Sequence, residues 1–236
     1  MKIEEIKGRR EIERVRERGN REDKMWARMR KKGIILMMMV MGCNSGGGIK
    51  EGEEGKARKG DGSVIDLKVV GEKIKSAVEF LGKVKEVHVL VKSVDELAKA
   101  IGKKIKDSDQ ELDALDGKNG SLMAGVFQII LTVKGGLTKL ETDSSSVTEN
   151  IKTKITDAKT KSVNFLKKLQ EKNTYLGKEG VSNADAEKAI DYVKQKDGDK
   201  GAKELGELNK AVDELLVSSN KIVSDAIAEL VVKPTT

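Results

Sequence analysis

The sequence predicts an all-α protein, an elongated antiparallel bundle of four long helices plus one short helix. Three observations predict this class. From Val64 onward, apolar residues recur at spacings of three and four, as they do along one face of an α-helix. The only proline is Pro234, so no proline interrupts a helix in the interior of the chain. Aromatic residues make up only 3% of the 236 residues and charged residues 36%, which argues against a β-sandwich.

The first two long helices follow from two apolar stripes. The first helix is predicted over about residues 66–105, and the polar stretch 106–120 leaves a minor short hairpin open. The second helix takes Ser121 as its N-cap and is weakened locally by Gly135 and Gly136. The first stripe comprises Ile74, Val78, Leu81, Leu90, Val94, Leu97, Ile101 and Ile105, and the second comprises Leu122, Val126, Ile129, Val133, Leu137 and Leu140.

Three further helices complete the predicted bundle. A third long helix carries its stripe from Val147 to Leu169 and ends near Gly177, which is expected to adopt the left-handed conformation. Ser182 and Asp185 form a capping box for a short helix that extends to Val193. The last long helix carries its stripe on Leu205, Leu208, Val212, Leu215, Ser219, Ile222, Ala226 and Leu230. Because no single amphipathic helix can bury its own stripe, these helices must pack together.

The N-terminal residues have the layout of an export signal. A basic stretch that ends in Lys31 and Lys32 precedes ten uncharged residues, 33–42, and then Cys43. Ten residues are too few to span a bilayer, which takes roughly 20. We therefore predict a signal peptide over 25–42, a Gly-rich flexible tether over 43–63, a helical domain over 64–232 and a tail over 233–236. Residues 1–24 are an overlong start or a charged helical extension.

The residues before Cys43 resemble the lipobox of bacterial lipoproteins, with Gly42 directly before the cysteine and Val40 at the third position back. In that family the cysteine sulfur receives a diacylglycerol and the preceding peptide bond is cut. The resemblance implies a covalent lipid on Cys43 that tethers the bundle to a membrane, and no other cofactor. The alternative is a short buried helix over 33–42 with Cys43 as an ordinary free thiol.

The charge distribution argues against a nucleic-acid partner. Residues 1–32 hold 13 basic and 7 acidic residues, so they carry +6 of the total net charge of +7. Residues 33–42 are uncharged, so the chain from Cys43 onward carries only +1. A processed protein would therefore offer no overall basic excess to phosphates.

The sequence contains no group of residues that predicts catalysis or a metal site. A single Cys and a single His cannot supply a four-ligand zinc site. The run from Asp197 to Asp199 begins like a calcium loop, but Leu208 stands where the bidentate Glu belongs, so a solvated turn is favoured. His88 is expected to lie at the surface or between helices, with a pH-sensing or ligand role as the alternative.

Five segments resemble the variable small proteins and outer surface protein C of Borrelia spirochaetes. They are 43–46 (CNSG), 85–105 (KEVHVLVKSVDELAKAIGKKI), 119–130 (NGSLMAGVFQII), 176–181 (LGKEGV) and 200–206 (KGAKELG). The resemblance covers about residues 33–232, and His88 is more like the variable small proteins. It implies a helical bundle that forms a homodimer through its long helices and is lipid-anchored on the outer face of the cell outer membrane.

The resemblance implies a variable major antigen, exchanged for others by gene switching to evade host antibodies. The alternative is an adhesin that binds a host glycan or serum protein, for which Lys103, Lys104 and Lys106 form the candidate site because they lie close together. A third, weaker alternative is an internal coiled-coil scaffold. The segments expected to meet antibodies are the polar connections 106–118, 141–150 and 172–201.

Overall fold

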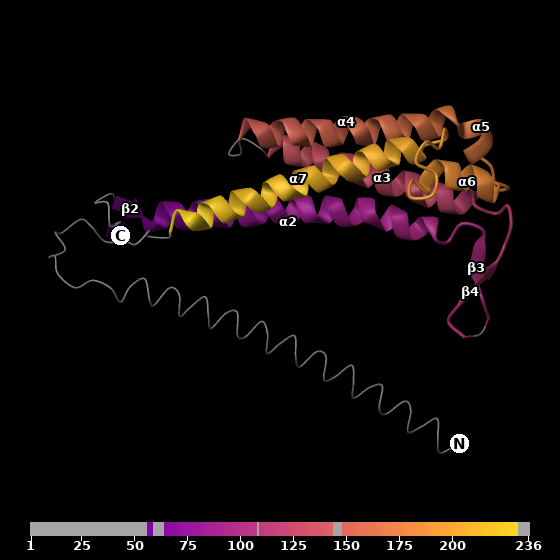
Figure 1. Cartoon of the computed structure of the whole chain (residues 1–236), viewed down its shortest axis with the longest axis horizontal. Coiled ribbons are helices and arrows are strands. Elements are labelled where there is room, and N and C mark those ends of the chain that lie inside the picture. Colours follow the sequence, from indigo (N-terminus) through magenta and orange to yellow (C-terminus); the bar gives the residue numbers. More distant parts are fainter. Residues whose placement is uncertain (1–55, 59–63, 108, 144–147, 231–236) are drawn as a thin grey trace, which may run out of the picture. The chain divides into compact units, whose positions relative to one another are not determined.

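The computed structural model of the chain describes residues 56–58, 64–107, 109–143 and 148–230, all within one compact unit, Gly55–Thr236. The predicted all-α class is confirmed, with four long helices and two short ones in this part of the chain (Figure 1). In chain order, the elements are β1 (Lys56–Arg58), β2 (Val64–Asp66), α2 (Leu67–Ala98), β3 (Lys103–Ile105), β4 (Leu112–Ala114), α3 (Gly120–Thr142), α4 (Glu149–Glu171), α5 (Asn173–Leu176), α6 (Asn183–Ile190) and α7 (Ala202–Ala228).

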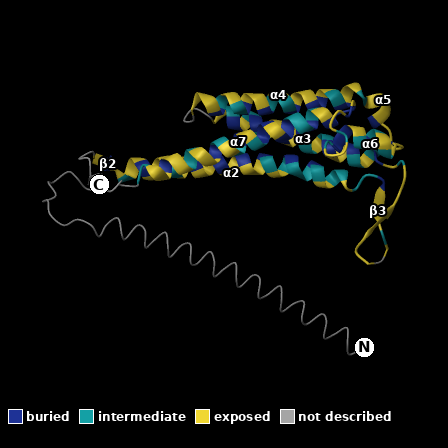
Figure 2. Ribbon diagram, in the orientation of Figure 1, coloured by how far each residue is buried: buried dark blue, intermediate teal, exposed yellow. Residues whose placement is uncertain are grey.

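The four long helices form a ring around one core. Helix α2 packs against α3 and α7, and α4 packs against the same two helices. Successive long helices run in opposite directions, and buried residues line the inner face of each (Figures 1 and 2). The largest fully buried side chains include Ile130, Leu137, Leu140, Ile151, Ile155, Phe165, Leu205, Leu208 and Leu215. Most of these residues belong to the predicted stripes, but on α3 Met123 and Ile130 are buried where the sequence predicted Leu122 and Ile129, which are only partly buried.

Helix α2 begins where the sequence predicts and ends earlier. The side chain of Asp66 accepts hydrogen bonds from the backbone N–H groups of Lys68 (3.0 Å) and Val69 (3.2 Å), which stabilises the first turn. The predicted end near Ile105 is wrong, because the helix stops at Ala98 and Gly102 adopts a left-handed conformation with φ of 67°. Ile105 consequently lies on a strand and is 86% exposed.

The hairpin left open between the first two helices is present. Strands β3 and β4 pair antiparallel, with Ile105 opposite Leu112 and Lys104 opposite Asp113. This hairpin stands clear of the helices (Figure 1). A second antiparallel pair joins β1 and β2, so β1 lies inside the segment predicted as a flexible tether.

The buried stripe of α2 differs from the predicted one. Val78 was assigned to the stripe and is 50% exposed, whereas Val84, Val87 and Val91 are at most 3% exposed. The three valines follow one another at spacings of three and four, and they join the core cluster formed with α3, α4 and α7. Their apolar surface is therefore used within the chain, so it does not argue for a second chain.

The predicted N-cap of α3 is wrong. Helix α3 begins at Gly120, and Asn119 rather than Ser121 is its N-cap residue. The backbone N–H of Gly120 donates to the carbonyl of Glu179 at 3.2 Å, and a Cβ on Gly120 would lie 2.4 Å from the carbonyl oxygen of Lys178. Glycine at this position therefore permits the close approach of the segment that follows α5.

The connection from α4 to α7 contains the predicted capping box. The backbone N–H of Asp185 donates to the Ser182 hydroxyl at 3.1 Å, which confirms the start of the short helix α6. Two other expectations for this region are wrong. Gly177 has a φ of −92° rather than a left-handed conformation, and Val193 lies beyond the end of α6 with 66% of its surface exposed.

Helix α3 alone among the described helices is long and apolar enough to cross a membrane by its composition. Its inner residues Met123, Val126, Ile130 and Val133 are nevertheless at most 4% exposed and belong to the core cluster. The high hydropathy of α3 therefore reflects its place in the bundle core.

Substitution of Leu215 by Ala is expected to lower the free energy of unfolding by about 2 to 5 kcal/mol, because it leaves a cavity in the core. Leu215 is fully buried, whereas Leu97 is only partly buried at the edge of the core. The matched variant Leu97→Ala should therefore lower the free energy of unfolding by less. Urea denaturation followed by circular dichroism at 222 nm measures both changes, and equal losses would contradict this placement of the core.

Candidate functional site

The predicted lipid-attachment residue, Cys43, and the signal segment 25–42 lie outside the described residues. The prediction of a lipid anchor at Cys43 therefore rests on the sequence. The other predicted site residues, Lys103, Lys104 and Lys106, all lie on the β3–β4 hairpin or directly after β3.

The structure brings the three lysines onto one hairpin but not onto one basic face. Residues alternate in direction along a strand, so Lys103 lies on one face and Lys104 on the other. Lys104 Nζ lies 3.5 Å from the carboxylate of Asp113 on the facing strand. Lys106 Nζ lies 3.2 Å from Asp109 and 3.6 Å from Glu111. Carboxylates therefore compensate two of the three ammonium groups, which leaves little excess charge for an anionic ligand.

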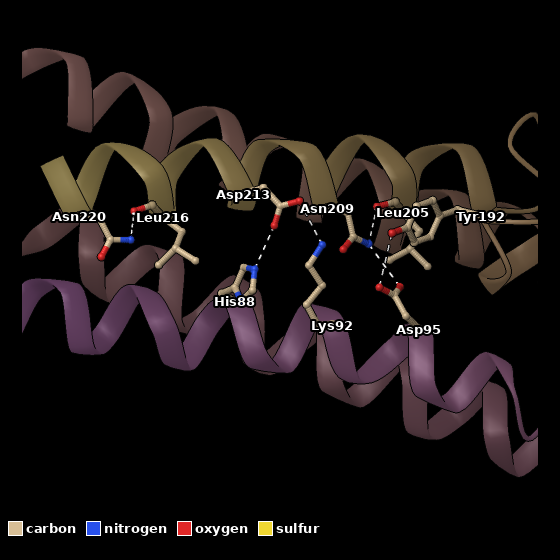
Figure 3. A network of polar contacts seen from close by, with 9 residues as sticks. All are labelled: His88, Lys92, Asp95, Tyr192, Leu205, Asn209, Asp213, Leu216 and Asn220. Atoms are coloured by element: carbon tan, nitrogen blue, oxygen red, sulfur yellow. Dashed lines mark hydrogen bonds and ion pairs between the residues drawn. The ribbon is translucent and has the colours of Figure 1, made fainter. Parts of the chain in front are cut away.

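His88 lies between two helices, which is one of the two placements that the sequence predicts for it. Its Nε2 atom lies 2.9 Å from Oδ1 of Asp213 on α7, and Nζ of Lys92 donates to Oδ2 of the same carboxylate at 3.1 Å (Figure 3). One carboxylate of α7 thus binds two residues of α2 that are one turn apart. Polar contacts of this kind favour one register of the two helices over others.

The polar contacts continue along the same seam toward the hairpin end of the bundle. Asp95 of α2 faces the amide of Asn209 on α7 and the hydroxyl of Tyr192, each at 3.5 Å (Figure 3). Burial raises the pKa of the Asp95 carboxyl above its ordinary value, although the ammonium of Lys92 opposes this shift. Burial and the nearby Asp95 carboxylate also raise the pKa of Tyr192. Sequence periodicity gave no signal for this cluster, because its members come from three separate segments.

Lys200 shows that the turn after α6 is not simply solvated. Only 7% of this residue is exposed, and its ammonium lies 4.2 Å above the ring of Tyr175 and 3.5 Å from Asp185. The cation thereby connects the turn to α5 and α6. Within the described ranges, no three His, Cys, Asp or Glu side chains are grouped so that they could hold a metal ion.

These features define a class of protein rather than a reaction centre. Many charged side chains of the described residues form ion pairs between helices and within the hairpin. An all-helical domain that follows a predicted export signal and a lipobox-like cysteine has the organisation of a helical-bundle lipoprotein. Such a protein presents a surface at the end of a tether.

Comparison with known proteins identifies the family. A family model described as "Lipoprotein" matches residues 64–236. Variable small protein 11 of Borrelia hermsii is 41% identical over 201 residues, which cover 84% of this chain and 93% of that protein. Outer surface protein C of Borreliella burgdorferi is 38% identical over 200 residues, covering 84% of this chain and 90% of the relative.

The solved structures agree. Variable Small Protein 1 of Borrelia turicatae superposes with a TM-score of 0.67 at 44% identity, covering 70% of this chain and 99% of that chain. The chain belongs to the lipoprotein family that contains the variable small proteins and outer surface protein C. It is a surface-exposed, lipid-anchored protein of the outer membrane, and the relatives in this family do not carry the names of enzymes.

We expect the substitution Asp95→Asn to leave the protein at least as stable as the parent at neutral pH, because it removes a charge that burial disfavours. An acid whose pKa is raised by folding binds protons more tightly in the folded state. The parent should therefore gain stability relative to the variant as the pH falls from neutral through that raised pKa, which lies above 3.8.

The matched control is Asp213→Asn, which weakens the contacts to His88 and Lys92. This substitution should lower the free energy of unfolding by about 1 kcal/mol at neutral pH. Thermal unfolding of the parent and the two variants between pH 4 and 8 measures both effects. A difference between the parent and Asp95→Asn that does not change with pH would contradict the assignment for Asp95.

Proposed function

We propose that this protein is a variable major antigen that is exchanged for related antigens by gene switching, so that the cell escapes host antibodies. The observation that carries the proposal is the match to Variable Small Protein 1, which keeps the fold over 99% of its chain at 44% identity. More than half of the aligned residues differ while the bundle remains. A protein of this kind can change its surface without losing its structure.

The physical basis of this tolerance is the separation of core from surface. Residues of the core stripes are constrained by packing, whereas exposed residues can change with little effect on stability. Between Asp107 and Asp116, every residue for which the structure gives an exposure is exposed. We therefore propose the hairpin segment 106–118 as the principal antibody target.

The structure narrows only one of the two other proposed target segments. Residues 144–147 of segment 141–150 lie outside the described residues. Segment 172–201 contains α5 and α6, and the buried residues Leu176, Val181, Asp191 and Lys200 are not available to an antibody. Within this segment we propose the exposed positions around Lys178 and Lys196 as the parts that antibodies contact.

The arrangement of the helix ends supports an outward-facing hairpin. Lys73, near the start of α2, binds Glu229, directly after the end of α7, at 3.0 Å. The chain therefore enters and leaves the bundle at the same end, and the hairpin follows the opposite end of α2 (Figure 1). If Cys43 carries the lipid, the hairpin end faces away from the membrane.

The second candidate function is an adhesin that binds a host glycan or serum protein. The clustering of Lys103, Lys104 and Lys106 on one hairpin favours it, and the ion pairs of Lys104 and Lys106 weaken it. We rank it below the antigen function for this reason. The internal scaffold is not supported, since the protein belongs to a family of surface lipoproteins.

We further propose that the protein acts as a homodimer, with no enzymatic activity and no nucleic-acid partner. The polar pairs along α2 and α7 are structural contacts, which supports a role in presentation rather than catalysis. The proposed dimer rests on the family resemblance alone. The buried valines of α2, Val84, Val87 and Val91, are covered by their own chain and give no further support for a second copy.

We predict that Cys43→Ala is released from cells or accumulates as a precursor, because the acyl chains are its membrane anchor. Each buried methylene contributes about 0.8 kcal/mol, and several chains are needed for stable attachment. Detergent phase partitioning of cells that express the parent or the variant measures this. The anchor assignment fails if the variant enters the detergent phase as the parent does.

We predict that exchange of segment 106–118 for that of a relative abolishes most recognition by serum raised during infection. Neutralising Lys103, Lys104 and Lys106 to Gln should leave serum recognition largely intact. Both variants are measured on purified protein by serum binding and by binding to host cells and glycans.

Circular dichroism is the control in this panel, because a misfolded variant would lose conformational epitopes indirectly. The ranking of the two functions is reversed if the lysine variant loses host-cell binding while the exchanged segment leaves serum recognition unchanged.

A further inference from the structure

The β3–β4 hairpin has an apolar face that its own bundle does not cover. Residues directly opposite each other in an antiparallel pair share a face, so Ile105 and Leu112 form a cross-strand pair. Ile105 is 86% exposed and Leu112 is 50% exposed. On the other face, Lys104 lies opposite Asp113 and the two side chains pair. The hairpin is therefore amphipathic, with its apolar face in solvent.

The outer edge of β3 is also open. The β3–β4 sheet has two strands, so β3 has no second neighbouring strand among the described residues. The backbone N–H of Lys106 donates to Glu111, and that of Leu115 donates to Gly102. Since hydrogen-bonding direction alternates along a strand, the backbone groups of Ile105 point away from β4, toward the open edge.

We propose that β3 pairs edge to edge with β3 of a second copy of this chain, antiparallel and around a two-fold axis at Ile105. The two hairpins then form one four-stranded sheet across the two copies. Ile105 of each copy exchanges backbone hydrogen bonds with Ile105 of the other. The contact is between copies and so rests on the proposed homodimer.

The aliphatic residues of the hairpin fit this arrangement. In the combined sheet, Leu112 and Ile105 of one copy continue directly into Ile105 and Leu112 of the other. A row of four aliphatic side chains thereby crosses the sheet on one face. This row gives the exposed side chain of Ile105 an apolar neighbour on both sides, which a single copy does not provide.

On the Ile105 face the charges favour this register. Ile105 is the midpoint between Lys103 and Asp107, so antiparallel pairing at Ile105 places Lys103 of each copy opposite Asp107 of the other. Neither residue forms an ion pair with any other described residue of its own chain. A parallel pairing in register would instead place Lys103 opposite Lys103, which is unfavourable. On the other face Lys104 of each copy lies opposite Lys106 of the other, and each of these lysines lies beside a carboxylate of its own hairpin. Self-complementarity around a two-fold axis is the requirement for a symmetric contact between copies.

The contact is small, because the hairpin offers only a few residues against the roughly 800 Å² per partner of a standard interface. It is therefore one part of the contact between copies rather than a sufficient interface. Anchoring of the copies to one membrane raises their effective concentration, which strengthens a weak lateral contact.

The test introduces one cysteine into the full-length chain in intact cells, followed by a mild oxidant. Ile105→Cys places two identical residues about 5.5 Å apart in Cα position, within the range that a disulfide bridges. Lys104→Cys is the matched control. It is one residue away, its backbone groups point toward β4 of its own chain, and it does not lie opposite Lys104 of the second copy. We expect about tenfold more cross-linked dimer from Ile105→Cys than from Lys104→Cys.

The charge pair is tested in the Ile105→Cys background. Lys103→Asp or Asp107→Lys alone should each lower the cross-linked fraction about three- to tenfold, because each creates like charges across the two-fold axis. The double exchange should restore it. Equal cross-linking at positions 104 and 105, or no rescue by the double exchange, overturns the proposed pairing.

Light scattering of the full-length parent in detergent separates this proposal from the homodimer. A two-chain mass without excess cross-linking at Ile105 overturns the hairpin pairing and leaves the homodimer in place. A one-chain mass, together with no cross-linking in cells, overturns both.

Discussion

The seam between α2 and α7 is the constraint on which the rest of the bundle depends. These are the two longest helices, and they bury one side of α2 against one side of α7 over most of their length. Buried apolar side chains of the two helices supply the area, and burial of apolar area alone is nearly indifferent to register. The contacts of Asp213 with His88 and Lys92 supply direction, because only one register lets this carboxylate bind both side chains.

The register of this seam determines what lies at its two ends. At one end it places Lys73 beside Glu229, so the chain enters and leaves the bundle together. At the other end, α2 stops at Ala98 and the left-handed Gly102 redirects the chain into the hairpin. Asn119 then ties this turn to the segment after α5, since its side chain accepts from Gly102 N–H at 2.8 Å and donates to the carbonyl of Val181 at 3.0 Å.

A fold held in this way suits a protein whose surface changes. Among the described residues, the buried polar side chains include Asn209 on α7 and the junction residues Asn119 and Lys200. Most remaining charged pairs lie at the surface, where each contributes little to stability. Such pairs can be replaced during sequence variation at a small cost, whereas loss of a junction residue would leave a buried partner without its hydrogen bond.

The sequence by itself determined the number and order of the long helices and most of their buried residues. Their residues repeat every three to four positions, and that period reports local geometry directly. The capping box of Ser182 and Asp185 was readable for the same reason, since both members lie within one turn. The family was also readable, because segments such as 176–181 are long enough to be specific.

Only the tertiary structure decided the features that depend on residues far apart in the chain. Ile105 continues the helical period, yet it lies on a strand because Gly102 turns the chain first. Val78 fits the stripe but is half exposed, whereas its neighbour Ala77 is buried together with the predicted Leu81. The partners of His88 and Lys200 are likewise set by packing. A side chain's neighbours in space are not encoded in its neighbours in sequence, so these contacts required the assembled bundle.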